Sequence, residues 1–272
     1  MHFFKPLAIF KKIALIFSFL TLISYHYPLK FERRNMSADK FEFKQFSINQ
    51  SNCAMKVGTD AVLLGAWVQI NEAQNILDIG TGTGVIAIML AQKSDSDIVA
   101  LDIDVKACEQ SRENIKNSPW PQKIKVYNES LQNYCCNHNE KFDLIVSNPP
   151  FFIDAYKSAE EARNQARHTD QLPFNDLVNC AVKLLKPNGR ICIILPTKES
   201  IKFIALALAQ HLFLTKITHV KTTQYKDEKR QLLQFEFTNK ELIEETLVIE
   251  QEERHCYSKE YKELTKDYYL SF

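Results

Sequence analysis

The sequence predicts an α/β fold, with a seven-stranded, mostly parallel sheet, helices on both faces and an antiparallel hairpin at its end. Two observations support this prediction. From Asn75 onward, short runs rich in β-branched residues alternate with helical stretches, which is typical of a parallel sheet. Two long runs of alternating apolar and polar residues, 215–221 and 231–238, then follow each other across a short polar connection. Such a pair predicts two antiparallel strands.

The individual elements can be placed in chain order. The expected parallel strands are residues 75–79, 97–103, 123–127, 142–147 and 190–195. The expected helices are residues 85–92, 105–117, 174–185 and 199–211. Pro119 and Pro121 end the second helix, and Pro187-Asn188-Gly189 predicts a helix stop followed by a turn. No repeat and no second domain interrupts this order.

The charge balance limits how a nucleic acid could be bound. The net charge is +1, but residues 1–35 carry six basic residues and one acidic residue. The remaining chain has 28 basic and 32 acidic residues and is therefore acidic, at about −4. A nucleic-acid partner would have to be held by a local basic patch, because the field of the whole molecule would not attract it.

The cysteines do not form a recognisable framework. There are seven, at positions 53, 108, 135, 136, 180, 192 and 256, without a C-x-x-C pair. An odd number without regular spacing indicates free thiols in a reducing compartment, and we expect no metal site. The expected location is therefore the cytoplasm.

Residues 1–35 differ from the rest of the chain. Lys11 and Lys12 precede an apolar run at 13–23, which is shorter than the ~20 residues of a spanning helix. Three interpretations are open: a signal or anchor, an interfacial helix, or translated sequence upstream of the real start. Met36 is in frame and opens a polar run, so we expect it to be the functional start. Residues 1–35 would then be an upstream or signal-like leader, with membrane association as the alternative, and residues 36–272 one domain.

A glycine-rich turn joins the first strand to the following helix. Three of the six glycines, Gly80, Gly82 and Gly84, lie in the sequence DIGTGTG, which begins at Asp78. Glycines at this junction permit positive φ and a close backbone approach to a ligand. A G-x-G turn alone would also suit NAD or FAD. The G-x-G-x-G alternation, the preceding Asp78 and the acidic Asp102 at the end of the next strand favour S-adenosylmethionine.

Each polar residue around this turn has a predicted role. Asp102 can accept the ribose hydroxyls of a nucleoside, and Asp104 is the alternative, unless it caps the helix that starts at Val105. Asp78 is placed to bind the amino group of the methionine moiety. Ser130, which follows Glu129 after the third strand, should lie near the adenine, where the contact could be made by the backbone alone.

The tetrapeptide Asn148-Pro149-Pro150-Phe151 follows the fourth strand, where the ligand crevice of a parallel sheet lies. The Asn148 side-chain oxygen and the Pro149 carbonyl can each accept one N–H of an exocyclic amino group. Both prolines lack an N–H that would compete for these acceptors. Phe151 offers a flat face for a base, worth ~1–3 kcal/mol. The pattern predicts methylation of a conjugated amino nitrogen.

Longer stretches resemble the bacterial tRNA1(Val) (adenine(37)-N6)-methyltransferase family, a Rossmann-like class I methyltransferase family. They are FKQF at 43–46, CAMKVGTDAVLLGAW at 53–67, NIKNSPW at 114–120, ARNQARHT at 162–169 and YSKEYKELTKDYYL at 257–270. The resemblance covers residues 43–272. It implies a lid segment at 43–70, with Thr59 and Asp60 beside the cofactor and Lys56 on a phosphate. A helix cap is the structural alternative for Thr59 and Asp60.

The resemblance also implies where RNA would be contacted. Arg163, Arg167 and His168 follow the tetrapeptide and are candidates for the RNA backbone, or for a solvated helix face. Lys229 and Arg230, with Lys221 and Lys226 nearby, form a second candidate patch at the hairpin.

The expected activity is methylation of adenine N6 in tRNA, at adenine 37 of tRNA1(Val), by a monomer that uses S-adenosylmethionine and needs no metal and no stable membrane partner. A glutamine N5-methyltransferase of release factors and a guanine-N2 rRNA enzyme are the alternatives, since both share the tetrapeptide. The first usually has a helical N-terminal domain, for which about 40 residues leave little room. The second has a duplicated N-terminal domain that this sequence lacks.

Overall fold

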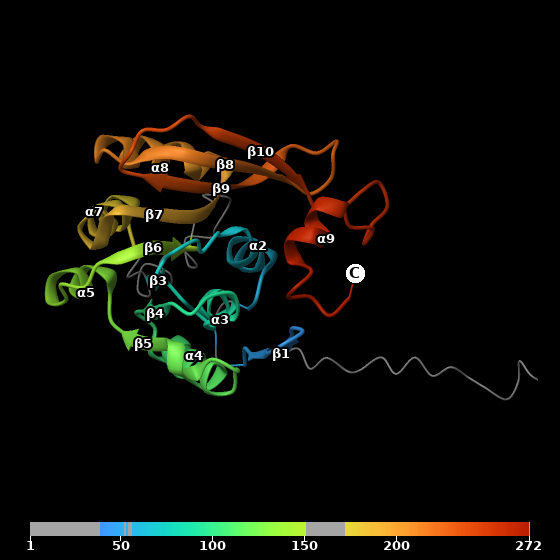
Figure 1. Cartoon of the computed structure of the whole chain (residues 1–272). Helices are drawn as coiled ribbons and strands as arrows, with labels where there is room; N and C mark the ends of the chain where they lie inside the picture. The colour runs from blue at the N-terminus through green and yellow to red at the C-terminus, as the bar shows by residue number, and fades with distance from the viewer. Residues whose placement is uncertain (1–38, 52, 54–55, 151–171, 272) are drawn as a thin grey trace, which may run out of the picture. The chain divides into compact units, whose positions relative to one another are not determined.

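The computed structural model describes residues 39–51, 53, 56–150 and 172–271 (Figure 1). Residues 38–272 group into one structural unit. Phe151, Arg163, Arg167 and His168 lie outside the described residues, so their predicted roles remain predictions.

A mixed sheet of eight strands forms the centre of this unit (Figure 1). Its strands are β3 (Asn75–Ile79), β4 (Asp97–Asp102), β5 (Ile124–Asn128), β6 (Phe142–Ser147), β7 (Leu185–Pro196), β8 (Phe213–Lys221), β9 (Glu228–Glu236) and β10 (Ile243–Val248). Their spatial order is β10-β8-β9-β7-β6-β3-β4-β5. β3 to β7 are mutually parallel, and β9 runs antiparallel to β7 and β8. The predicted class, with its antiparallel hairpin, is confirmed.

The sheet has one strand more than the seven predicted. β10 pairs in parallel with β8 at the edge of the sheet. Its sequence, IEETLV, does not alternate between apolar and polar residues, and its first four residues are exposed. An edge strand that buries so little apolar surface leaves no periodic signal in the sequence, which is why it was not predicted.

Helices cover both faces of the sheet (Figure 1). On one face lie α2 (Thr59–Trp67), α3 (Val85–Gln92), α4 (Val105–Lys116) and α9 (Lys259–Thr265). On the other lie α5 (Leu131–Asn137), α7 (Phe174–Leu184) and α8 (Thr197–Ala209). Successive strand residues enter opposite cores, as Ile76 and Leu77 do, so the central strands are apolar throughout.

The expected boundaries agree with the structure to within three residues, except around Pro187-Asn188-Gly189. These residues belong to β7 instead of forming a separate turn. The register changes from Phe142 opposite Leu185 to Leu144 opposite Arg190, so the β7 segment between them bulges out of the ladder. Pro187 has no N–H to pair, and a Cβ on Gly189 would come within 2.9 Å of the Phe142 carbonyl oxygen.

The N-terminal part of the fold is fixed against the α3 face. A short hairpin of β1 (Lys40–Glu42) and β2 (Ser47–Asn49) packs there through Phe43, stacked on Phe46 at 4.5 Å between ring centroids. The Asn114 amide donates to the carbonyl oxygens of Asn49 (2.8 Å) and Thr83 (2.9 Å). This side chain therefore ties β2 to the glycine-rich turn.

α2 is fixed by a half-buried lysine, Lys93, that follows α3. Lys93 Nζ donates to the carbonyl oxygens of Gly65 (2.7 Å), Ala66 (3.2 Å) and Val68, which are free at the end of α2. Burial lowers the pKa of Lys93 to about 8. The last turn of α2 is thereby attached to the residue that follows α3.

Candidate active site

The glycine-rich turn after β3 has the backbone conformation that its residues predicted. Gly80, Gly82 and Gly84 have φ of 74°, 54° and 81°, values that side chains disfavour. A Cβ on Gly80 or Gly82 would meet no atom within 4 Å, whereas one on Gly84 would lie 3.2 Å from Ser111 Cβ. The first two glycines therefore leave room for a ligand, and Gly84 allows α4 to pack closely.

Asp102, at the end of β4, supports this turn and faces the same space. Its Oδ2 accepts from the Gly82 N–H (2.8 Å) and its Oδ1 from the Asp104 N–H (3.0 Å). Burial raises the pKa of Asp102, while these backbone N–H groups oppose the rise. Each carboxylate oxygen has another lone pair, so the group can still accept two ribose hydroxyls.

Asp104 has the alternative role that the sequence left open. It is the N-cap of α4, and its side chain accepts from the Lys106 N–H at 2.8 Å. It also borders the cavity described below, so its side chain lies within reach of a bound cofactor as well.

Asp78 lies beneath the turn. Its side chain is fully buried, and Oδ2 accepts from the Thr81 hydroxyl at 2.7 Å. Burial raises its pKa to about 7, with a smaller contribution from Asp102. Oδ1 has no hydrogen-bond partner among the described residues, and Asp78 does not line the cavity. The predicted contact with the methionine amino group would require this buried carboxylate to act from below the loop.

A cavity of about 980 Å³ opens at the carboxyl ends of β3, β4, β5 and β6. It lies where the order of parallel strands reverses, between β3 and β6, the position at which such sheets bind ligands. Most predicted site residues in the described ranges line it. They are Lys56, Thr59, Asp60, Gly80, Gly82, Asp102, Ser130, Asn148, Pro149 and Pro150.

Asn148 and the two prolines emerge from β6 directly into this cavity. The preceding Ser147 donates its hydroxyl to the Ile79 carbonyl oxygen (2.9 Å), which joins the ends of β6 and β3. Asn148 is half-buried and Pro149 is buried. No protein hydrogen bond occupies the Asn148 amide within the described part of the chain, so its oxygen is available to a ligand.

Ser130 contributes to the cavity mainly as a structural residue. Its hydroxyl oxygen accepts from the Asn133 N–H (3.2 Å) and caps α5. The neighbouring Glu129 is held by its own backbone N–H to the Asp102 carbonyl oxygen (3.0 Å) and by its side chain to Asn137 and His138. An adenine beside Ser130 would therefore contact mainly backbone atoms, which is the alternative that the sequence analysis left open.

The start of α2 forms the opposite wall. Gly58 is the N-cap and no side chain caps the helix, so Thr59 and Asp60 do not have the capping role considered from the sequence. Asp60 Oδ2 instead accepts from Arg230 Nε at 2.7 Å. Arg230, a predicted RNA contact, is therefore paired with a predicted cofactor residue. Lys56 lies 3.8 Å from Asp39 in a second ion pair.

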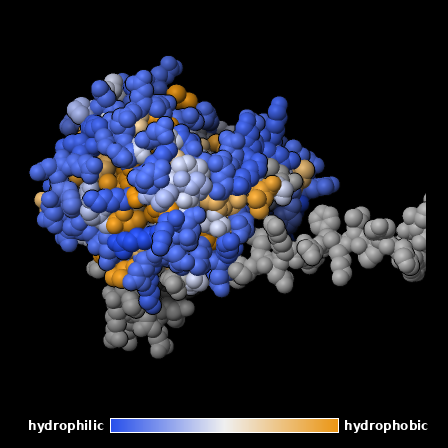
Figure 2. Space-filling model, turned by 60° about the horizontal axis from the view of Figure 1, so that its bottom comes forward, coloured by the Kyte–Doolittle hydropathy of each residue, from blue (hydrophilic) through white to orange (hydrophobic). Residues whose placement is uncertain are grey.

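The face of the molecule seen in Figure 2 is mostly hydrophilic, with apolar residues gathered in a few places. Among the cavity residues, the sequence analysis did not identify the apolar ones. Ile103, 46% exposed, borders the cavity beside Asp102. Asn128 Nδ2 fixes this turn by donating to the Asp102 (3.1 Å) and Ile103 (2.9 Å) carbonyl oxygens. The sequence signal that could have identified Ile103 is its position between Asp102 and Asp104 at the end of a strand.

Comparisons with known proteins agree with this geometry. Residues 51–226 match the family described as the methyltransferase small domain. A tRNA1(Val) (adenine(37)-N6)-methyltransferase of Christiangramia forsetii is 46% identical over 239 residues, which are 86% of this chain and 99% of the relative. The chain belongs to the tRNA1(Val) (adenine(37)-N6)-methyltransferase family. Family members of the same name from Flavobacterium psychrophilum and Trichodesmium erythraeum are 47% and 45% identical and cover 85% and 87% of the chain.

Solved structures similar to this family member share its fold at low sequence identity. A predicted O-methyltransferase from Agrobacterium tumefaciens has a TM-score of 0.63 at 18% identity, over 77% of this chain and 96% of the other. NSun6 from Pyrococcus horikoshii has a TM-score of 0.52 at 13% identity, over 67% and 53%. These similarities establish a methyltransferase-like fold.

Within the residues that the structure describes, no cluster of three or more His, Cys, Asp or Glu side chains could hold a metal ion. Nor does any helix there have the length and apolar character needed to cross a membrane.

Proposed function

We propose that this protein transfers a methyl group from S-adenosylmethionine to N6 of adenine 37 in tRNA1(Val). The observation that carries the proposal is the position of Asn148 and Pro149, at the end of β6, in the cavity that also contains Gly80, Gly82 and Asp102. The names of relatives that are 43–47% identical support the tRNA and the position.

The cavity has the features that the cofactor requires. Open space above Gly80 and Gly82 admits the methionine portion, Asp102 suits the ribose, and Ile103 offers an apolar surface for the adenine. The cofactor fits this cavity because of its open space above the glycines, its carboxylate and its apolar surface. When bound, the cofactor supplies an electrophilic methyl group whose transfer leaves a neutral thioether.

The residues after β6 would prepare the nucleophile. The exocyclic nitrogen of adenine is weakly nucleophilic because its lone pair is delocalised into the ring. Hydrogen bonds from its two N–H groups to the Asn148 side-chain oxygen and the Pro149 carbonyl oxygen favour a pyramidal nitrogen. These bonds strengthen in the transition state and therefore accelerate the reaction. The proton leaves to water after the methyl group has bonded.

The substrate position also agrees with this site. Adenine 37 lies beside the anticodon in a single-stranded loop, so its extrusion costs less than opening a duplex. We propose that Phe151 stacks on the extruded base, and that Lys56, Arg163, Arg167, His168, Lys229 and Arg230 contact the RNA. The Asp60 ion pair orients Arg230 and leaves Lys229 as the more exposed cation of the hairpin.

The test is methyl transfer from labelled S-adenosylmethionine to a tRNA1(Val) transcript, followed by nucleoside analysis. We expect N6-methyladenosine, and no label in a transcript with guanine at position 37. Methyl transfer to the guanine-37 transcript at the same rate would contradict the position, and label in protein would contradict the substrate class.

We propose that residues 36–272 form the methyltransferase domain, with residues 43–70 as its lid segment, and that it acts as a monomer in the cytoplasm. The Christiangramia forsetii relative supports the size of this domain, since 239 residues of this chain cover 99% of that protein. A protein beginning at Met36 should methylate tRNA at the full-length rate and sediment as one chain. A large loss of activity would contradict the domain boundary.

A further inference from the structure

A second cavity, of about 540 Å³, lies beside the first. Three tyrosines of the C-terminal segment line it together with residues of β1 and β9. We call it the tyrosine pocket and define it by Tyr257, Tyr261, Tyr269, Phe41, Lys229 and Arg230. The proposed RNA contacts include its two cations, Lys229 and Arg230, but the proposed function gives no role to its aromatic residues.

The aromatic side chains form a connected group. The ring of Tyr261 lies 5.3 Å from that of Tyr257 and 6.3 Å from that of Tyr269, and Phe41 is 6.3 Å from Tyr269. Tyr261 is buried, whereas Tyr257 and Tyr269 are half-buried. Flat, partly accessible rings held by a buried neighbour suit a flat aromatic ligand, because stacking then costs little ordering of the protein.

The charges around the pocket favour a base inside it and a phosphate at its rim. Asp60 and Glu250 balance Lys229 and Arg230 among the lining residues, and the Asp60–Arg230 distance is 2.7 Å. A neutral aromatic interior does not attract a phosphate. Lys229 is exposed and lies at the rim, where a phosphate could remain in solvent while it is contacted.

The tyrosine pocket adjoins the proposed active site. Thr59 and Asp60 line both cavities, so the first turn of α2 is the wall that they share. An RNA strand that places its target base in the first cavity would therefore bring a neighbouring base to the second.

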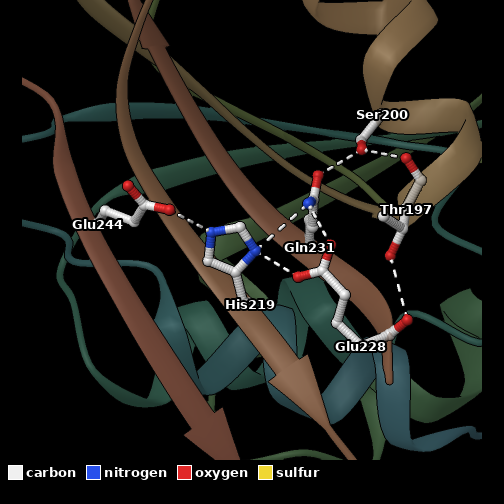
Figure 3. Close-up of polar contacts among 6 residues, drawn as sticks. All are labelled: Thr197, Ser200, His219, Glu228, Gln231 and Glu244. Carbon is white, nitrogen blue, oxygen red and sulfur yellow. Dashed lines mark hydrogen bonds and ion pairs between the residues drawn. The ribbon is translucent and has the colours of Figure 1, made fainter.

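A polar network holds the basic rim in place (Figure 3). Glu228 and Gln231, which flank Lys229 and Arg230, are both members of it. Gln231 Nε2 donates to Glu228 Oε1 (2.9 Å) and Gln231 also bonds Ser200 of α8. His219 of β8 contacts Glu228 and, through Nε2, Glu244 of β10 at 2.8 Å. The rim is thus anchored to three neighbouring elements before any ligand binds.

We propose that the tyrosine pocket binds the base of a nucleotide next to the target adenine, stacked on Tyr257, with Lys229 on the adjoining phosphate. The proposal rests on the proposed function and deepens it. It assigns to the C-terminal segment the recognition of a flanking nucleotide in a single-stranded loop.

The experiment measures steady-state methylation of the tRNA transcript by the full-length protein and its variants. Tyr257→Ala should raise KM for tRNA about 5- to 150-fold, since stacking of one base contributes this much, with kcat and the Kd for S-adenosylmethionine little changed. Tyr257→Phe retains the ring and should behave like the wild type. Tyr225→Ala is the matched control, because Tyr225 is 79% exposed and does not line the pocket.

A set of transcripts, each with one abasic nucleotide flanking adenine 37, tests the base directly. One abasic position should raise the KM of the wild type and leave that of Tyr257→Ala unchanged. An unchanged KM for Tyr257→Ala, or abasic penalties equal in both proteins, would overturn the proposal. So would equal losses in tRNA and cofactor binding with a lowered Tm, which would indicate a structural role. Failure of the proposed function is distinguishable, because the wild type would then not methylate the intact transcript.

Discussion

Asp102→Asn separates the two contributions that the Asp102 carboxylate makes. Each of its oxygens accepts a different backbone N–H, from Gly82 and from Asp104. The substitution preserves shape but turns one oxygen into a donor, so one of these bonds is lost. It also removes the charge that would bind the ribose hydroxyls. A hydrogen bond to a charged group contributes ~1.5–3 kcal/mol, so the Kd for S-adenosylmethionine should rise about 10- to 150-fold.

The stability of the ligand-free protein should change much less. The pKa of Asp102 is raised, which means that burial disfavours its charge more than the two N–H groups favour it. Removing the charge therefore offsets the lost hydrogen bond. The Tm should remain within a few degrees of the wild type, whereas a structural role alone would lower Tm and cofactor affinity together.

Titration calorimetry and thermal unfolding measure these two quantities, and Asp104→Asn is the matched control. Asparagine caps helices as well as aspartate does, so this variant should keep α4 and change Kd by less than about threefold. If Asp104→Asn weakened cofactor binding as much as Asp102→Asn, the assignment of the ribose to Asp102 would be refuted.

Three other substitutions test the remaining parts of the site. Asn148→Ala should lower kcat by about 100-fold or more and leave the cofactor Kd within a few-fold, and equal losses in both would point to a structural role. Burial raises the pKa of Asp78 from 3.8 to about 7, so the folded state holds this proton more tightly and stability falls as pH rises through that window. At pH 8 the Asp78→Asn protein should therefore be more stable than the wild type, by at most about 4 kcal/mol, whereas at pH 4 it should not. Urea unfolding at both pH values measures this, and the same difference in unfolding free energy at pH 4 and pH 8 would contradict it. Gly82→Ala should cost roughly 1–2 kcal/mol from its positive φ and block the cofactor, whereas Gly84→Ala should cost more stability because its methyl group meets Ser111. Equal losses of stability in the two variants would contradict the assignment of Gly82 to ligand binding and of Gly84 to helix packing.

The sequence predicted local elements best where a continuous apolar run is buried along nearly its whole length. β3, β6 and α3 have the predicted boundaries because each is buried along nearly its whole length and bordered by turn residues. It failed for β10, whose exposed residues produce no pattern. The Asp60–Arg230 pair joins residues 170 positions apart, a distance at which local patterns carry no information. Nor could composition show that Asp78 lies under the loop, since a buried and an exposed aspartate read alike.

The polar character of β10 has a consequence for the whole molecule in solution. A strand at the border of a sheet presents unpaired backbone groups on which another chain can extend the sheet, and this is a common route to aggregation. Here Glu244 and Glu245 occupy that border, and Glu245 is held by Lys216 at 3.0 Å. A second copy approaching edge to edge would bring the same carboxylates against them, and the resulting repulsion opposes uncontrolled growth of the sheet.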